Sequence, residues 1–72
     1  MIGSRLREAR MARGLTQQAM ANLLGVGLRT YQKYEEGSRN PPLDTLANMS
    51  KVLGVTTDWL LGLSDEAPSG AR

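Results

Sequence analysis

The sequence predicts an all-α domain. Apolar residues recur at intervals of three and four, which is the spacing of one face of a helix. Glycine follows most of these periodic stretches, and glycine readily adopts the positive φ that ends a helix. No stretch alternates apolar and polar residues as a half-buried strand would. Because the chain has only 72 residues, it has room for one small domain.

Two helices are predicted in the N-terminal part of the chain. The first begins at Ile2 or Ser4 and ends at Arg13, before Gly14. The second follows Thr16, a favourable N-cap residue, and stops at Gly25. The expected apolar faces are Ile2, Leu6 and Ala9 in the first helix, and Ala19, Met20, Leu23 and Leu24 in the second.

Three more helices are predicted, over residues 28–36, 43–53 and 57–61. Glycine follows each of them, and Thr56 caps the last one. Residues 64–72 are rich in Ser, Pro, Gly and charge, so we interpret them as a flexible tail or linker. The expected inward-facing residues are Tyr31 and Tyr34 in the first of these helices, and Leu43, Leu46, Ala47, Ser50 and Leu53 in the second.

Composition excludes several classes of function. The chain has no Cys and no His, so thiolate and imidazole metal ligands and a histidine base are absent. No apolar run is long enough to span a membrane and no signal peptide opens the chain, so we expect a cytoplasmic protein. Residues 1–40 carry seven basic and three acidic residues, a net +4, whereas residues 41–72 carry two and four, a net −2. This asymmetry favours a polyanionic partner, although a solvated basic face also explains it.

The connection between the second and third helices is unusually short. Only Gly25, Val26 and Gly27 separate them, so the third helix cannot return antiparallel along the second and must cross it steeply. A steep crossing needs a small residue where the helices touch, and Ala21 provides one. This spacing is typical of a helix-turn-helix, here over residues 17–36.

Short segments in a fixed order carry a family resemblance. They are Leu15–Gln17, Ala21, Leu24–Val26, Tyr34–Gly37, Asn40–Pro41, Leu43, Thr45–Leu46, Leu53–Val55 and Asp58–Gly62. Over residues 6–61 the sequence therefore resembles the Cro/C1-type (XRE-like) helix-turn-helix domain of phage repressors and small bacterial regulators. The resemblance implies a compact five-helix bundle that binds DNA. Three residues depart from the pattern: Gly27 and Pro42 replace capping side chains, and Leu28 replaces a polar residue.

The resemblance also implies residue roles in DNA recognition. The start of the second helix would bind phosphate, because a helix N-terminus attracts anions. The third helix would enter the major groove, where Arg suits guanine, Gln suits adenine and an apolar group suits the thymine methyl. The alternatives are simple capping by Thr16 and an ordinary solvated face on the third helix. The base-contacting set is Leu28, Arg29, Gln32 and Lys33, and the phosphate-contacting set is Thr16, Gln17, Ser38, Arg39 and Asn40.

Two further expectations concern packing. Arg10 lies on the apolar stripe of the first helix, where a cation needs a partner, and we expect an ion pair with Glu35 that orients the third helix. The alternative is that Arg10 extends along its aliphatic stem to water. The apolar run of Trp59, Leu60 and Leu61 is interpreted as a candidate dimer interface, and the alternative is that Trp59 covers the open end of the core.

The sequence thus predicts a sequence-specific double-stranded DNA-binding transcriptional regulator. We expect a repressor that binds a palindromic operator as a homodimer, with no catalysis, cofactor, metal or small-molecule ligand. The alternatives are the antitoxin of a toxin–antitoxin pair, a restriction–modification controller, and a protein-interaction module that has lost DNA binding. The chain is also compatible with being the DNA-binding part of a longer regulator.

Overall fold

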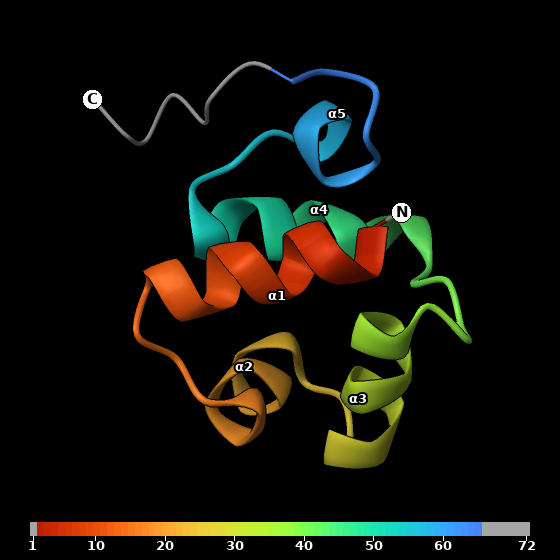
Figure 1. Ribbon diagram of the computed structural model, residues 1–72. Coiled ribbons are helices and arrows are strands. Elements are labelled where there is room, and N and C mark those ends of the chain that lie inside the picture. Colours follow the sequence, from red (N-terminus) through yellow and green to blue (C-terminus); the bar gives the residue numbers. More distant parts are fainter. Residues whose placement is uncertain (1, 66–72) are drawn as a thin grey trace.

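The computed structural model describes residues 2–65, which form five helices and no strand. The helices are α1 (Ile2–Ala12), α2 (Gln17–Leu24), α3 (Leu28–Glu36), α4 (Leu43–Leu53) and α5 (Thr57–Leu60). In Figure 1, α1 crosses the middle of the molecule, with α2 and α3 below it and α5 above it. The predicted all-α, five-helix architecture is confirmed, and α1 and α5 each end one residue earlier than expected. No helix in the described part of the chain is long and apolar enough to cross a membrane.

Threonine and glycine set the ends of several helices. The hydroxyl oxygens of Thr16 and Thr56 each accept a hydrogen bond of 3.0 Å from a backbone N–H in the first turn of α2 and α5, respectively. Gly37 ends α3 with a φ of 83°, a conformation that side-chain-bearing residues rarely adopt. Gly27 and Pro42 precede α3 and α4 and supply no side-chain cap, as their residue types predict.

One hydrophobic core holds the helices together. α1 packs against α3 and α5, while α2 packs against α3 and α4. Leu15, Val26 and Val52 lie partly buried at the edge of this core. The fully or largely buried apolar residues are Ile2, Leu6, Ala9, Met20, Ala21, Leu24, Tyr31, Tyr34, Leu46, Met49, Leu53, Val55, Trp59 and Leu60.

Three of the expected core positions are wrong. Leu23 is 57% exposed and Leu43 is 81% exposed, and Ala47 is exposed as well. In α4 the row that faces the core is Leu46, Met49 and Leu53, and Met49 is completely buried. The row expected from the sequence, which begins at Leu43, and the observed row both have helical spacing. Only the packing of α4 against α2 and α5 therefore decides which row faces the core.

Arg5 of α1 binds α5 and the segment of chain that follows it. Its Nη1 atom donates hydrogen bonds of 2.7 Å to the carbonyl oxygens of Trp59 and Ser64, and its Nη2 atom lies 2.7 Å from Asp65 Oδ1. The guanidinium carbon also sits 5.0 Å from the centre of the Trp59 ring. Residues 64 and 65, expected to belong to a flexible tail, are therefore anchored, and the rest of that predicted tail lies outside the described residues.

Candidate nucleic-acid interface

The turn between α2 and α3 has a helix-turn-helix geometry. Gly25 ends α2 with a φ of 70°, and the Val26 N–H donates a 3.0 Å hydrogen bond back to the Ala21 carbonyl. Val26 then packs against the core and Gly27 leads directly into α3. Ala21 is completely buried, which fits a small residue at the point where the two helices meet.

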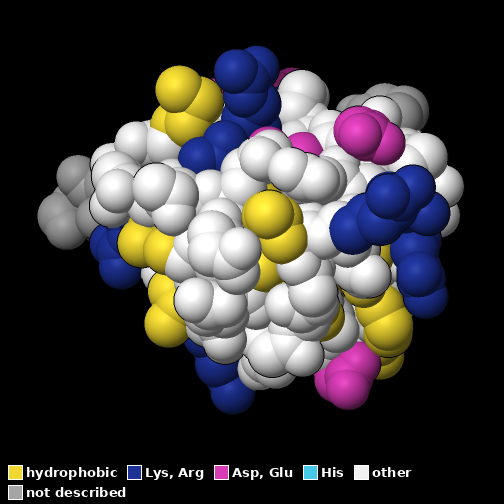
Figure 2. Space-filling view, turned by 90° about the horizontal axis from the view of Figure 1, so that it is seen from below, with side chains coloured by type: hydrophobic (Ala, Val, Ile, Leu, Met, Phe, Trp, Pro, Cys, Tyr) yellow, Lys and Arg dark blue, Asp and Glu magenta, His cyan; other side chains and the backbone are white. Residues whose placement is uncertain are grey.

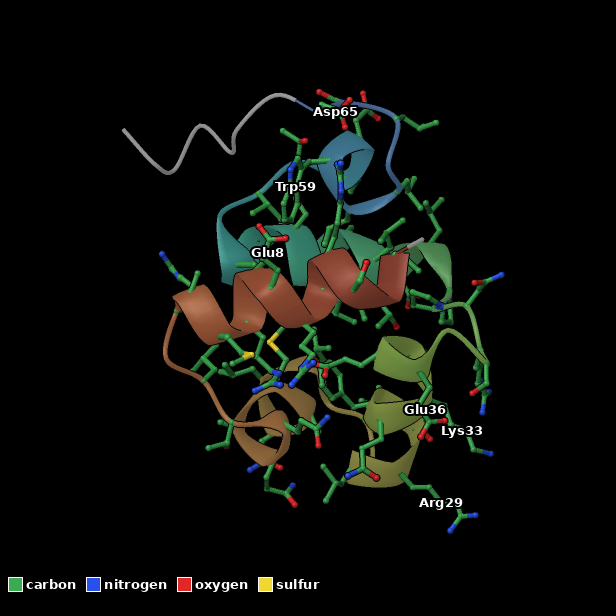
Figure 3. The ribbon with its side chains drawn as sticks, viewed as in Figure 1. Glu8, Arg29, Lys33, Glu36, Trp59 and Asp65 are labelled. Atoms are coloured by element: carbon green, nitrogen blue, oxygen red, sulfur yellow. The ribbon has the colours of Figure 1, made fainter. Side chains whose placement is uncertain are left out.

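The outer face of α3 carries the four residues expected to contact bases. Tyr31 and Tyr34 point into the core, and this fixes which side of α3 faces outward. Arg29 and Lys33 are exposed, and Figure 3 shows both side chains extending away from the bundle. Leu28 and Gln32 are half-buried beside them. The face therefore combines two free cations with one apolar and one amide group.

The residues expected to contact phosphate lie at the start of α2 and after α3. Ser38, Arg39 and Asn40 are all exposed. The Ser38 N–H donates a 3.1 Å hydrogen bond to the Lys33 carbonyl. At the start of α2, the Thr16 hydroxyl accepts the Ala19 N–H and so acts as a cap. That capping role does not occupy the hydroxyl proton, which stays available to a second partner.

Figure 2 shows the face of the molecule that α2 and α3 form, seen from below. Uncharged polar groups and backbone fill most of its centre. Lys and Arg side chains are spread around its edge, and a few Asp and Glu side chains lie there too. This arrangement suits a polyanion whose negatively charged groups contact the rim and whose uncharged groups contact the centre.

A buried ion pair lies behind this face. Arg10 Nε is 2.6 Å from Glu35 Oε2, and the side chains of Arg10 and Glu35 are only 11% and 5% exposed. Arg10 also donates from Nη1 to the Leu15 carbonyl at 2.7 Å, so its charge is held by α3 and by the loop before α2. The structure thus brings together the two residues that the sequence pairs, and Arg10 does not reach out to water.

Glu35 collects two further donors that the sequence analysis did not name. The Tyr31 hydroxyl donates to Glu35 Oε2, and Gln17 Nε2 donates to Glu35 Oε1 at 3.1 Å. The signal for Tyr31 was available, because residues four apart share one face of a helix. The contact from Gln17 joins α2 to α3 and has no such local signal.

This network keeps Glu35 ionised. Burial alone would raise the pKa of Glu35, but the hydrogen bonds from Arg10, Tyr31 and Gln17 outweigh it and hold that pKa below its ordinary value. Burial, reinforced by the bond to Glu35, raises the pKa of Tyr31, so its hydroxyl stays a donor. The hydrogen bond with Glu35 raises the pKa of Arg10. All three groups therefore keep fixed roles as donors or acceptor.

The expected dimer interface needs a correction. Trp59 is 7% exposed and Leu60 is completely buried, so the chain's own core already covers both side chains. Trp59 closes the core beside Arg5, which is the alternative that the sequence left open. Of the three residues, only Leu61, at 44% exposed, offers surface to another molecule.

The fold and the α2–α3 turn define a helix-turn-helix protein, and comparison with known proteins agrees. A family model described as "Helix-turn-helix" matches residues 6–60. The chain belongs to the Cro/C1-type helix-turn-helix family.

Several curated relatives carry names of regulators. The chain is 48% identical over 61 residues to the SPbeta prophage-derived HTH-type transcriptional regulator YonR of Bacillus subtilis, covering 85% of this chain and 56% of that protein. It is 43% identical to the HTH-type transcriptional regulator ImmR of the same species, covering 85% and 48%. It is 42% identical to the cryptic phage CTXphi transcriptional repressor RstR of Vibrio cholerae, covering 90% and 59%. The chain thus spans roughly half the length of these relatives.

Proposed function

We propose that this chain is a sequence-specific double-stranded DNA-binding transcriptional regulator that acts in the cytoplasm as a repressor. The observation that carries the proposal is the outer face of α3, where exposed Arg29 and Lys33 flank half-buried Leu28 and Gln32. An α-helix with such a face fits the major groove, where base edges are read. The names of the relatives support regulation of transcription, and the name of RstR supports repression.

The proposed contacts divide into two kinds. Arg29 and Gln32 read bases by hydrogen bonds, Leu28 contacts a thymine methyl group, and Lys33 contacts a base or a phosphate. The exposed segment Ser38–Asn40 and the start of α2, including Thr16 and Gln17, contact the phosphate backbone. Binding of this kind involves no catalytic step.

We propose further that the protein binds as a homodimer to a palindromic operator. A single recognition helix reads only a few base pairs, and two copies related by a two-fold axis read two half-sites about one turn of DNA apart. Leu61 stays in this proposal as a surface residue of the interface, whereas Trp59 and Leu60 do not.

Selection from a random double-stranded DNA pool tests the function. We expect an enriched palindrome with half-sites about 10 base pairs apart. If each copy neutralises about four phosphates, the logarithm of the binding constant should fall with the logarithm of salt concentration at a slope near −7. A double variant, Arg29→Ala with Lys33→Ala, serves as the control that keeps the fold and loses the enrichment. Recovery of a random pool by the unaltered protein would contradict sequence-specific binding.

A further inference from the structure

An acidic side chain lies on the same face of α3 as the residues proposed to contact bases. Glu36, the last residue of α3, is seven positions after Arg29 and three after Lys33, and residues at these spacings share one face of a helix. Glu36 is exposed, and Figure 3 shows its side chain on the same side of α3 as that of Lys33. The face proposed to meet DNA therefore carries a carboxylate as well as two cations.

No cation pairs with this carboxylate within residues 2–65. The two ion pairs of that range use other carboxylates, those of Asp65 and Glu35. Glu36 also lies at the C-terminal end of α3, where the helix dipole is negative and favours cations over anions. Neither an ion pair nor the dipole therefore accounts for a negative charge at this position.

The hydroxyl of Ser38 joins Glu36 to the segment proposed to contact phosphate. The Ser38 N–H bonds to the Lys33 carbonyl at 3.1 Å, so the chain after Gly37 folds back against the last turn of α3. Ser38 Oγ then lies 3.3 Å from Glu36 Oε1 and 3.4 Å from the Lys33 carbonyl oxygen. A hydroxyl carries only one proton. While Ser38 donates that proton to either acceptor, it cannot donate it to a phosphate.

The position of Glu36 along α3 determines which part of DNA it would meet. In a helix-turn-helix complex, the N-terminal residues of the recognition helix contact base edges. Glu36 is at the opposite end of α3, next to the exposed segment Ser38–Asn40. An ionised carboxylate has no proton to donate to a phosphate oxygen, and two negative charges at short range repel each other. A carboxylate beside this segment therefore opposes the approach of a phosphate.

We propose that Glu36 weakens binding to DNA of every sequence, because it repels the phosphate at Ser38–Asn40 and competes with it for the Ser38 proton. This inference rests on the proposed DNA-binding function. Arg29 and Gln32 select the operator, whereas Glu36 limits the affinity for any duplex. The ratio between the affinities for the operator and for other DNA does not depend on Glu36.

The test measures affinity for two duplexes, the selected operator and a duplex of scrambled sequence, at several salt concentrations. Glu36→Gln removes the charge at nearly constant shape, and Glu36→Lys reverses it. Both are also made together with Ser38→Ala, which removes the contested proton. Glu8→Gln is the matched control, because Glu8 is an exposed glutamate of α1, outside the helix-turn-helix (Figure 3). Thermal unfolding verifies that each variant is folded at the assay temperature.

We expect Glu36→Gln to bind both duplexes more tightly at low salt, by about threefold or more for each copy of the chain, and Glu36→Lys to bind them more tightly still. The gain should shrink as salt is raised, because salt screens exposed charges. The ratio of the two affinities should stay unchanged. In the Ser38→Ala background the gain should be smaller, because there is no Ser38 proton left to release. Glu8→Gln should change both affinities much less.

Several results would overturn the inference while leaving the proposed function standing. Unchanged affinity in Glu36→Gln, or a gain no larger than that of Glu8→Gln, would show that Glu36 does not face a phosphate. A loss of affinity for the operator alone would show that Glu36 reads a base, since a carboxylate can accept from the cytosine amino group. An undiminished gain in the Ser38→Ala background would overturn the competition for the Ser38 proton. If the unaltered protein binds neither duplex, the proposed function fails and this inference fails with it.

Discussion

Gly3 of α1 lies against the main-chain carbonyl of Glu35 in α3, with no room for a side chain between the two helices. A Cβ atom on Gly3 would come within 3.0 Å of the Tyr34 carbonyl oxygen and closer still to that of Glu35. About two turns further along α1, Arg10 binds the Glu35 side chain. α1 therefore contacts the end of α3 through the backbone and through a buried ion pair.

Substituting Gly3 with alanine should force α1 and α3 apart. Alanine is the better helix former by about 1 kcal/mol, yet we expect the free energy of unfolding to fall by about 1–3 kcal/mol, because backbone atoms cannot yield to the new methyl group. Urea unfolding measures this change. Met11→Ala, at an exposed position of the same helix, is the control. An increase in stability would show that the close approach is not a constraint.

A double-mutant cycle on Arg10 and Glu35 should give a large coupling energy. Each single change, Arg10→Met or Glu35→Leu, leaves a buried charge unpaired and should cost about 3–5 kcal/mol. The double variant should recover only part of this, because the Leu15 carbonyl, the Tyr31 hydroxyl and Gln17 lose their partner as well. A coupling within the ~0.2–1 kcal/mol range of exposed pairs would argue against a role in placing α3.

The lowered pKa of Glu35 makes one part of the stability dependent on acid. Because the pKa is lower in the folded state, the ionised carboxylate stabilises the fold at pH values above its ordinary pKa of 4.5. That contribution is lost as the pH falls further, through the folded-state pKa. We expect Glu35→Gln to be clearly less stable than the unaltered protein at neutral pH. This gap, the difference between their free energies of unfolding, should narrow in acid. Glu36→Gln, at the exposed neighbouring residue, is the control for a carboxylate that lies outside this network. A gap of constant size across this range would contradict the proposed ionised network.

Truncation of Arg29 and truncation of Arg39 should impair DNA binding in different ways. Arg29→Ala should cost about 1–3 kcal/mol on the preferred operator and relax the choice at one base pair, because α3 presents Arg29 outward. Arg39→Ala should weaken binding to all sequences alike and flatten the salt slope by about one for each copy. Titrations on matched and mismatched duplexes at several salt concentrations separate the two. Equal loss of specificity in both variants would mean that α3 is not the helix in the groove.

Helix ends and the turn were predictable from the sequence because they depend on local chemistry. Gly25, Gly37 and Gly54 supply the positive φ that ends α2, α3 and α4, and Thr16 and Thr56 cap the starts of α2 and α5. These effects involve residues within one turn of each other, so the sequence contains them directly.

Helix rotation and long-range polar contacts were harder to predict. Leu43 and Met49 both lie on rows of helical spacing, and packing alone places Met49 inside. The contact of Gln17 with Gln32 bridges residues 15 apart and requires the crossing angle of α2 and α3. Arg5 reaches residues more than 50 positions away, and nothing in its local sequence distinguishes it from Arg7. The residues proposed to face DNA could be named from the family resemblance, but the hydrogen bonds among them depend on the folded arrangement.

The anchoring of residues 64 and 65 by Arg5 has a practical consequence for experiments on this protein. The hydrogen bonds of Arg5 to Ser64 and Asp65 hold the end of the described chain near α5, on the side of the molecule opposite α2 and α3 (Figure 1). A fluorophore, an affinity tag or a surface linkage joined shortly beyond this point starts from that far side. Single-molecule or immobilised-protein assays attached there should leave the helix-turn-helix face open to the solution.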